Sequence, residues 1–257
     1  MTTTVTATAA PETLQGMRLD LESVRLSYTG DAVVDGLSLH VPAGEILVLT
    51  GPSGCGKSTV LRALAGLLPP DSGRVLADGA EVVTTSRDRG MVFQDSALLP
   101  WRTVRSNIEL ALQLRGAPRA GRRERAERWI DEVGLTGFAD FLPKSLSGGM
   151  RQRVQLARGL AGAPRAVMMD EPFAALDTQT RAAMQRLLIQ TWQAHPTTVV
   201  FVTHDVDEAL ILGDRVAVLG RVGQPLRALV DVPQPRVTDA VRTDARAEII
   251  AALHHSS

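Results

Sequence analysis

One short stretch, "GPSGCGKST" at residues 51–59, restricts the fold more than any other part of the sequence. It matches the pattern G-x-x-x-x-G-K-[ST]. It follows a continuous apolar run, "EILVLT" (45–50), and precedes a segment whose apolar residues recur at helical spacing. A continuous apolar run is typical of a parallel strand covered on both faces. The order strand, glycine loop, helix therefore predicts an α/β core with a phosphate-binding loop, called the P-loop below.

The residue types in the P-loop suit a nucleotide and its metal ion. Glycine lets the backbone N–H groups come close to phosphate oxygens, and the helix that follows adds a favourable dipole. Lys57, one of only two lysines in the chain, supplies charge for the outer phosphates, and the Ser58 hydroxyl suits Mg²⁺. We predict that the nucleotide-binding residues here are Gly51, Pro52, Ser53, Gly54, Cys55, Gly56, Lys57, Ser58 and Thr59.

A second apolar run, "AVMMDEP", ends in two adjacent acids, Asp170 and Glu171. Buried strands do not end in carboxylates without a reason, because desolvating a charge is costly. Beside a P-loop, Asp170 is suited to hold Mg²⁺ through its water, and Glu171 to orient an attacking water or accept its proton. The pair favours hydrolysis of the nucleotide over storage.

Two more polar residues follow apolar runs that resemble buried strands. Gln94 follows "GMVF", and His204 follows "TTVVFVT". Ligands of α/β sheets gather at the carboxyl ends of parallel strands, so both residues are candidates for the same site. On spacing alone, each could equally be a junction residue with a purely structural role.

The segment from Val104 to Phe141 changes to a helical pattern rich in arginine and glutamate. Its arginines could suggest nucleic acid, but Arg123/Glu127 and Glu124/Arg128 have the i,i+4 spacing of a solvated helix face. We therefore predict a helical lobe inserted into the core and no binding of nucleic acid.

The remaining patterns divide the chain. Alternating apolar residues in 19–41 indicate half-buried antiparallel strands. We expect a disordered leader (1–17), a P-loop ATPase domain (18–220) containing the helical lobe (about 103–145), and a C-terminal extension (221–257) with a strand and an Ala-rich helix. The predicted fold class is α/β, a P-loop ATPase core with a mostly parallel sheet, an antiparallel β lobe and an inserted helical lobe.

Composition limits the partners. The 28 basic and 28 acidic residues cancel, so no overall field attracts nucleic acid or an anionic membrane. Cys55 is the only cysteine, which fits a reducing compartment. No run approaches the roughly 18 apolar residues that span a bilayer, and the N-terminus lacks the basic start and apolar core of a signal peptide.

A second glycine-rich entry into a helix occurs in "SLSGGMRQRVQLARGL" (145–160), called the signature segment below. Ser147 and two glycines precede a helix whose buried face is marked by Val154, Ala157 and Leu160, which is another anion-binding helix start. One nucleotide cannot easily fill two such sites in one compact domain. We therefore expect Ser147 and Gly149 to face the γ-phosphate held by another copy of the chain.

Together, "GPSGCGKST", "MVFQ", "LSGGMRQR", "VMMDEP", "ALD" and "VTHD" occur in an order that resembles the ATP-binding subunit of ABC transporters, from about Leu19 to Leu219. The resemblance implies a head-to-tail homodimer with ATP and Mg²⁺ between P-loop and signature segment. It implies an integral membrane permease partner, an indirect link to a substrate-binding protein, and a peripheral location on the cytoplasmic face of the bacterial inner membrane.

The resemblance also implies roles for single residues. Gln94 becomes a Mg²⁺ and water contact, His204 the γ-phosphate switch, and Asp177 an interface aspartate. The signature residues that face ATP become Ser147, Gly148 and Gly149, although Met150 replaces the usual glutamine. Tyr28 matches the aromatic residue that stacks on adenine. Alternatively, Tyr28 is a strand residue whose side chain packs in the core.

The details of "LSGGMRQRVQLARGL", "DEPFAALD" and "SALLPW" look most like importers of nitrate, taurine and alkanesulfonates. In that group the region of Leu98, Leu99 and Trp101 receives the membrane subunit, although such a cluster could also be plain core. Other small-molecule importers, exporters and soluble ABC ATPases acting on nucleic acid remain alternatives. A module that binds ATP without hydrolysing it is disfavoured by Glu171 and His204.

Overall fold

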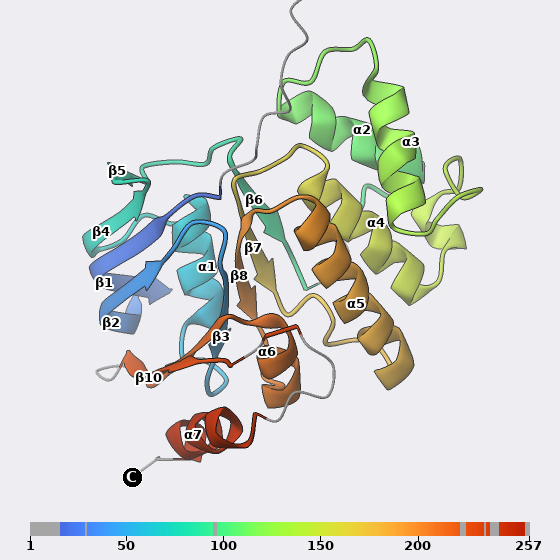
Figure 1. Cartoon of the computed structure of the whole chain (residues 1–257). Helices are drawn as coiled ribbons and strands as arrows, with labels where there is room; N and C mark the ends of the chain where they lie inside the picture. Colours follow the sequence, from blue (N-terminus) through green and yellow to red (C-terminus); the bar gives the residue numbers. More distant parts are fainter. Residues whose placement is uncertain are drawn as a thin grey trace, which may run out of the picture.

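The structure, a computed structural model, describes residues 16–28, 30–94, 97–221, 225–233, 235–236 and 242–254. All but two residues of the expected disordered leader lie outside these ranges. Two β-sheets, with helices on both faces of the larger one, form the body of the molecule (Figure 1). This arrangement confirms the predicted α/β class.

The smaller sheet is antiparallel. Its strands are β1 (Leu19–Tyr28), β2 (Asp31–Val41), β4 (Ser72–Ala77) and β5 (Ala80–Glu81), in the order β2-β1-β4-β5. The alternation seen in the sequence puts one side of β1 and β2 into the core, because successive side chains of a strand point to opposite faces. The antiparallel β lobe is present as expected.

The larger sheet holds the apolar runs of the sequence. It contains β3 (Ile46–Thr50), β6 (Arg89–Val92), β7 (Ala166–Asp170), β8 (Thr198–Val202), β9 (Arg215–Leu219) and β10 (Leu226–Asp231). The order is β10-β9-β3-β8-β7-β6, and every pairing is parallel except that of β10 with β9. All residues of β3 and β8 are buried, as a strand covered on both faces requires.

Helices cover the larger sheet on opposite faces. Helix α1 (Lys57–Ala65) packs in a core shared with the antiparallel sheet. On the other face, one continuous core includes α4 (Gly148–Leu160), α5 (Thr178–Ala194), α6 (Val206–Leu212) and α7 (Thr243–His254). The P-loop helix and the signature helix therefore lie on opposite faces of one sheet (Figure 1).

The segment between β6 and β7 contains α2 (Val104–Leu114), α3 (Arg122–Glu132) and the short 3₁₀ helix η1 (Pro143–Ser145). The expected helical character is wrong for residues 133–142, which form turns around Gly134 and Gly137, both with positive φ. The expected Arg123/Glu127 pair is also replaced, since Glu127 forms an ion pair with Arg105 of α2.

The other expected ion pair, Glu124 with Arg128 on α3, forms at 2.5 Å.

Among the residues that the structure describes, no helix has both the length and the apolar character required to cross a bilayer.

Candidate functional site

The predicted site residues come together because four parallel strands end side by side. Strands β3, β8, β7 and β6 are consecutive neighbours in the larger sheet, so their carboxyl ends form one continuous edge, called the carboxyl edge below. The P-loop follows β3, His204 follows β8, Asp170 ends β7 with Glu171 directly after it, and Gln94 follows β6. Residues separated by more than a hundred positions are thereby gathered at one place, where α/β proteins bind ligands.

The P-loop has a backbone that needs glycine. Gly51 and Gly56 have φ values of 150° and 94°. A Cβ atom on Gly51 would lie 2.6 Å from the carbonyl oxygen of Leu219, so a side chain there would collide with the end of β9. The loop can therefore run close to the sheet and present its N–H groups outward only if these positions are glycine.

Lys57 is folded over the P-loop rather than extended into solvent. Its side chain is only 8% exposed, and its Nζ donates hydrogen bonds to the carbonyl oxygens of Gly51 at 2.9 Å and Pro52 at 3.0 Å. These bonds hold a positive charge over the concave side of the loop, where it is available to a phosphate group.

The rest of the loop divides into buried and exposed positions. Ser53 and Gly54 are exposed, whereas Cys55 and Thr59 are buried. Burial raises the pKa of the Cys55 thiol above its usual range. Cys55 is thus a packing residue of the loop and not a thiolate at neutral pH.

Ser58 and Asp170 meet across the site. The Ser58 hydroxyl donates a hydrogen bond to Oδ1 of Asp170 at 2.9 Å. Burial raises the pKa of Asp170, against the lowering effect of that hydrogen bond. A hydroxyl and one carboxylate form an oxygen-only donor set of the kind that suits Mg²⁺, which usually keeps several waters and binds substrate phosphates as well. Among the described residues there is no cluster of three or more His, Cys, Asp or Glu, which is the kind of set that would hold a metal by protein ligands alone.

Glu171 has an unusual backbone. Its φ of 41° lies in the left-handed region, which is rare for a residue with a side chain, and its N–H donates to the carbonyl of Val202 at 3.1 Å. Oε2 of Glu171 lies 3.1 Å from Nδ1 of His204, whose side chain is 66% exposed. The strand end therefore directs a carboxylate and an imidazole toward each other, an arrangement that spacing in the sequence did not indicate.

Gln94 is exposed at the end of β6, and helix α4 holds the backbone beside it. The amide of Gln152 donates to the carbonyl of Gln94 at 3.4 Å, and that of Gln155 donates to the carbonyl of Phe93 at 2.6 Å. The sequence pattern alone does not single out these two glutamines of the signature helix. The one cue in the sequence to their role is that two amide side chains interrupt an otherwise apolar helix face, and both are buried in the structure.

The "SALLPW" cluster divides between core and surface. Leu98 is buried in the main core, Leu99 is half-buried, and Trp101 is 72% exposed. Leu98 is therefore part of the core and Trp101 is the exposed apolar residue of this segment.

The signature segment and Asp177 line one cavity of about 540 Å³. The Ser147 hydroxyl caps α4 by accepting from the N–H of Met150 at 3.2 Å, and Gly148 and Gly149 form the first turn. Asp177 caps α5 in the same way, and its hydrogen bonds from Thr180 lower its pKa. The structure thus brings Asp177 beside the three signature residues. This placement agrees with the interface that the family resemblance implies, although no local pattern in the sequence joins the two segments.

Tyr28 is the last residue of β1, as expected, but its side chain lies outside the part of the chain that the structure describes.

A parallel sheet, a P-loop at the carboxyl end of one strand and a pair of acids at the end of another define the class of P-loop nucleotide-binding proteins. Residues 34–174 match the ABC transporter family.

Relatives cover most of the chain. The nitrate import ATP-binding protein NrtD of Synechocystis is 44% identical over 227 residues, 87% of this chain and 85% of that protein. The aliphatic sulfonates import ATP-binding protein SsuB of Pseudomonas entomophila is 43% identical over 244 residues, 94% and 87% of the two chains. The chain belongs to the ABC transporter family.

A solved structure is similar as well. It is the dimeric structure of a post-hydrolysis state of an ATP-binding cassette bound to ADP and Pi. The TM-score is 0.73 at 31% identity, and the match covers 84% of this chain and 99% of that one.

Proposed function

We propose that this chain is the ATP-hydrolysing subunit that powers an importer of inorganic or organic anions, such as nitrate, taurine or an alkanesulfonate. The observation that carries the proposal is the carboxyl edge, where a P-loop, two acids, a histidine and a glutamine end four adjacent strands. The nitrate and sulfonate relatives, which are more than 40% identical over most of the chain, support the anion class.

The P-loop binds the phosphates of ATP. Backbone N–H groups of residues 51–59 and the N-terminus of α1 face the phosphate oxygens, and the Lys57 ammonium neutralises their charge. Tyr28 stacks on the adenine. Ser58, Asp170 and Gln94 hold Mg²⁺, which supplies neutralisation of the charge that develops on the phosphates.

Glu171 acts as the general base toward the attacking water, and its strained backbone keeps the carboxylate directed at the edge. His204, 3.1 Å from Glu171, contacts the γ-phosphate and reports its presence. Gln94 orients the same water and connects the site to the segment that carries Trp101.

The second half of each ATP site comes from another copy of the chain. Ser147, Gly148 and Gly149 begin a helix on the face of the sheet opposite α1, so they contribute most directly to an ATP held by a partner. Asp177 lines the same cavity and lies at the same interface. The related ATP-binding cassette is dimeric, which supports a dimer. The head-to-tail arrangement is proposed from the placement of the P-loop helix and the signature helix on opposite faces of the sheet.

The dimer works on the cytoplasmic face of the bacterial inner membrane, bound to permease subunits that a substrate-binding protein supplies with cargo. Trp101 and its neighbours form the docking surface for the permease. ATP binding closes the dimer, and hydrolysis with phosphate release opens it.

The replacement Glu171→Gln tests the proposed role of the base. We expect steady-state turnover to fall by about 10² to 10⁴, the usual contribution of a general base, while ATP binding is preserved because the P-loop is untouched. Turnover is measured by phosphate release and binding by equilibrium titration. Glu132→Gln, an acid of α3 away from the carboxyl edge, is the control. Nearly unchanged turnover in Glu171→Gln would show that Glu171 is not the base.

A further inference from the structure

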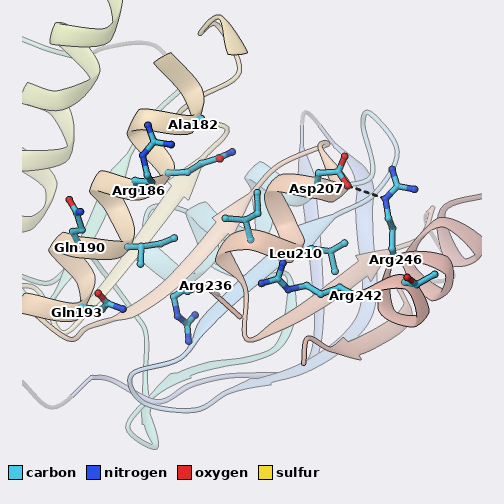
Figure 2. A pocket seen from close by; sticks show the side chains of 13 residues that line it. Ala182, Arg186, Gln190, Gln193, Asp207, Leu210, Arg236, Arg242 and Arg246 are labelled. Atoms are coloured by element: carbon cyan, nitrogen blue, oxygen red, sulfur yellow. Dashed lines mark hydrogen bonds and ion pairs between the residues drawn. The ribbon is translucent and has the colours of Figure 1, made fainter. Parts of the chain in front are cut away.

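Two loops at the carboxyl edge carry residues that are proposed to act on ATP. The β7–α5 loop (171–177) begins with Glu171, and the β8–α6 loop (203–205) contains His204. The helices that follow these loops, α5 and α6, lie side by side (Figure 2). A side chain that joins the two helices near their starts therefore also sets how the two loops lie relative to each other.

One side chain of α5, that of Arg181, contacts both loops. Its Nη1 donates to Oδ2 of Asp205 at 3.2 Å, and its Nη2 donates to the carbonyl oxygen of Leu176 at 3.2 Å. Leu176 belongs to the β7–α5 loop, and Asp205 directly follows His204. Arg181 thus links the loop that carries Glu171 to the loop that carries His204. These two hydrogen bonds are called the Arg181 bridge below.

Helix α5 itself gives no reason for a cation at this position. Arg181 is the fourth residue of the helix, close to the N-terminus, where the helix dipole favours anions. Its side chain is 30% exposed and that of Asp205 is 32% exposed, so the ion pair between them is partly withdrawn from water. The hydrogen bonds of the bridge offset the unfavourable dipole.

Asp205 is a fixed end for the bridge. Its Oδ1 caps α6 by accepting from the backbone N–H groups of Asp207 at 2.9 Å and Glu208 at 3.1 Å. Its Oδ2 is the atom that faces Arg181. One turn further along α5, Gln185 donates to buried Glu208 at 2.9 Å. The two helices are therefore joined at two levels, of which the Arg181 bridge is the one next to the ATP-site loops.

The contact between Glu171 and His204 needs support of this kind. The His204 side chain is 66% exposed, and water screens the charges of such a pair, so it holds itself together only weakly. The distance of 3.1 Å between the two groups therefore depends on where the two loops are held. We propose that Arg181 is a positioning residue, which holds the loops so that Glu171 and His204 act on the same ATP. This inference rests on the proposed function.

The bridge requires a guanidinium group. A planar guanidinium directs several N–H groups at separate acceptors in a fixed geometry, whereas the ammonium of lysine is a point charge on a flexible stem. Arg181→Lys therefore keeps the charge but cannot hold the Leu176 carbonyl and the Asp205 carboxylate in the same way. The matched control is Arg186→Lys, since Arg186 is an exposed arginine of the same helix (Figure 2).

Steady-state ATPase assays of the full chain test the effect on the reaction. We expect kcat of Arg181→Lys to fall by about 10- to 10²-fold, because small displacements of catalytic groups have effects of this size. Affinity for MgADP, measured by titration, should be unchanged because the P-loop is untouched, and Arg186→Lys should behave as the wild type. A wild-type midpoint of thermal unfolding establishes that the variant is folded. A kcat equal to that of the wild type would overturn the proposal.

Asp205→Asn separates the bridge from the helix cap. The side-chain oxygen of asparagine can still cap α6, but it carries no charge for Arg181. If both residues act through the bridge, Arg181→Lys/Asp205→Asn should lose no more turnover than the more affected single variant. Losses that multiply would show that the two residues act independently, which contradicts the bridge.

The imidazole NMR signal of His204 reports its position without any turnover. The signal is assigned by its loss in His204→Gln. We expect it to shift in Arg181→Lys and to stay in place in Arg186→Lys. An unshifted signal in Arg181→Lys would overturn the positioning role. A wild-type chain that hydrolyses no ATP, but whose His204 signal shifts in Arg181→Lys, would count against the proposed function and leave the bridge standing.

Discussion

At the level of a single residue, Glu171 combines a left-handed backbone with a proposed catalytic role. Its left-handed backbone costs about 1 to 3 kcal/mol, and the hydrogen bond from its N–H to Val202 helps to keep it in place. Strain of this kind accumulates where a side chain must be aimed, and here the carboxylate is aimed at His204. The backbone geometry and the proposed catalytic role therefore have one explanation.

Ser147 tests whether the ATP site is shared. In Ser147→Arg a long cation occupies the start of α4, where the helix dipole is unfavourable for it and where the partner's ATP is proposed to lie. We expect hydrolysis to be lost while the monomer still binds nucleotide with its own P-loop. The check is titration of nucleotide into dilute protein beside an ATPase assay at high concentration. Equal loss of monomer affinity would instead place the signature segment in its own chain's site.

The sequence indicated most of the candidate site, and the reason is local. The P-loop and the Asp170–Glu171 pair combine residue types that a structural junction has little use for. Two contacts of the site join residues far apart in the sequence. Glu171 and His204 are 33 positions apart, and Gln94 and Gln152 are 58 positions apart. No local sequence pattern can therefore predict these contacts. The same holds for the cavity shared by Ser147 and Asp177.

At the level of elements, apolar patterns were sufficient wherever burial is complete. Strands β3, β7 and β8 read as continuous apolar runs because helices cover both faces of the sheet. Residues 133–142 resemble a helix in the sequence although they form turns, because apolar residues that face the core from turns mimic helical spacing over a short window. The order of the strands depends on long-range pairing, which a single sequence does not encode locally.

Helix α7 gives a test of the C-terminal extension. Ile249 is fully buried in the main core, together with Val230 of β10, so α7 is packed as part of the fold. We expect Ile249→Ala to lower the free energy of unfolding by about 2 to 5 kcal/mol, through lost burial and the cavity left behind.

The matched control is Ile250→Ala, since Ile250 is only half-buried and should lose about 1 kcal/mol. Both variants are measured by denaturant unfolding. Equal stability of the two would mean that α7 is not docked in solution.

At the level of the whole molecule, the two faces of the larger sheet have different tasks. The P-loop helix and the antiparallel sheet share one core, and the signature helix, the helical lobe and α7 share the other. The proposed mechanism uses this division, because two copies facing head to tail bring the P-loop of one to the signature segment of the other. Trp101 remains exposed on the side of the helical lobe, where a permease is proposed to dock.

The most direct test of the central claim is to isolate the chain from its native membranes. The Glu171→Gln variant, held with ATP in mild detergent, is purified and its partners are identified, with Trp101→Ala in the same background as the comparison. The account predicts a polytopic membrane protein in stoichiometric amount, weakened or lost in Trp101→Ala. Recovery with ribosomes or DNA, and without any membrane protein, would contradict the importer function while leaving the ATPase chemistry intact.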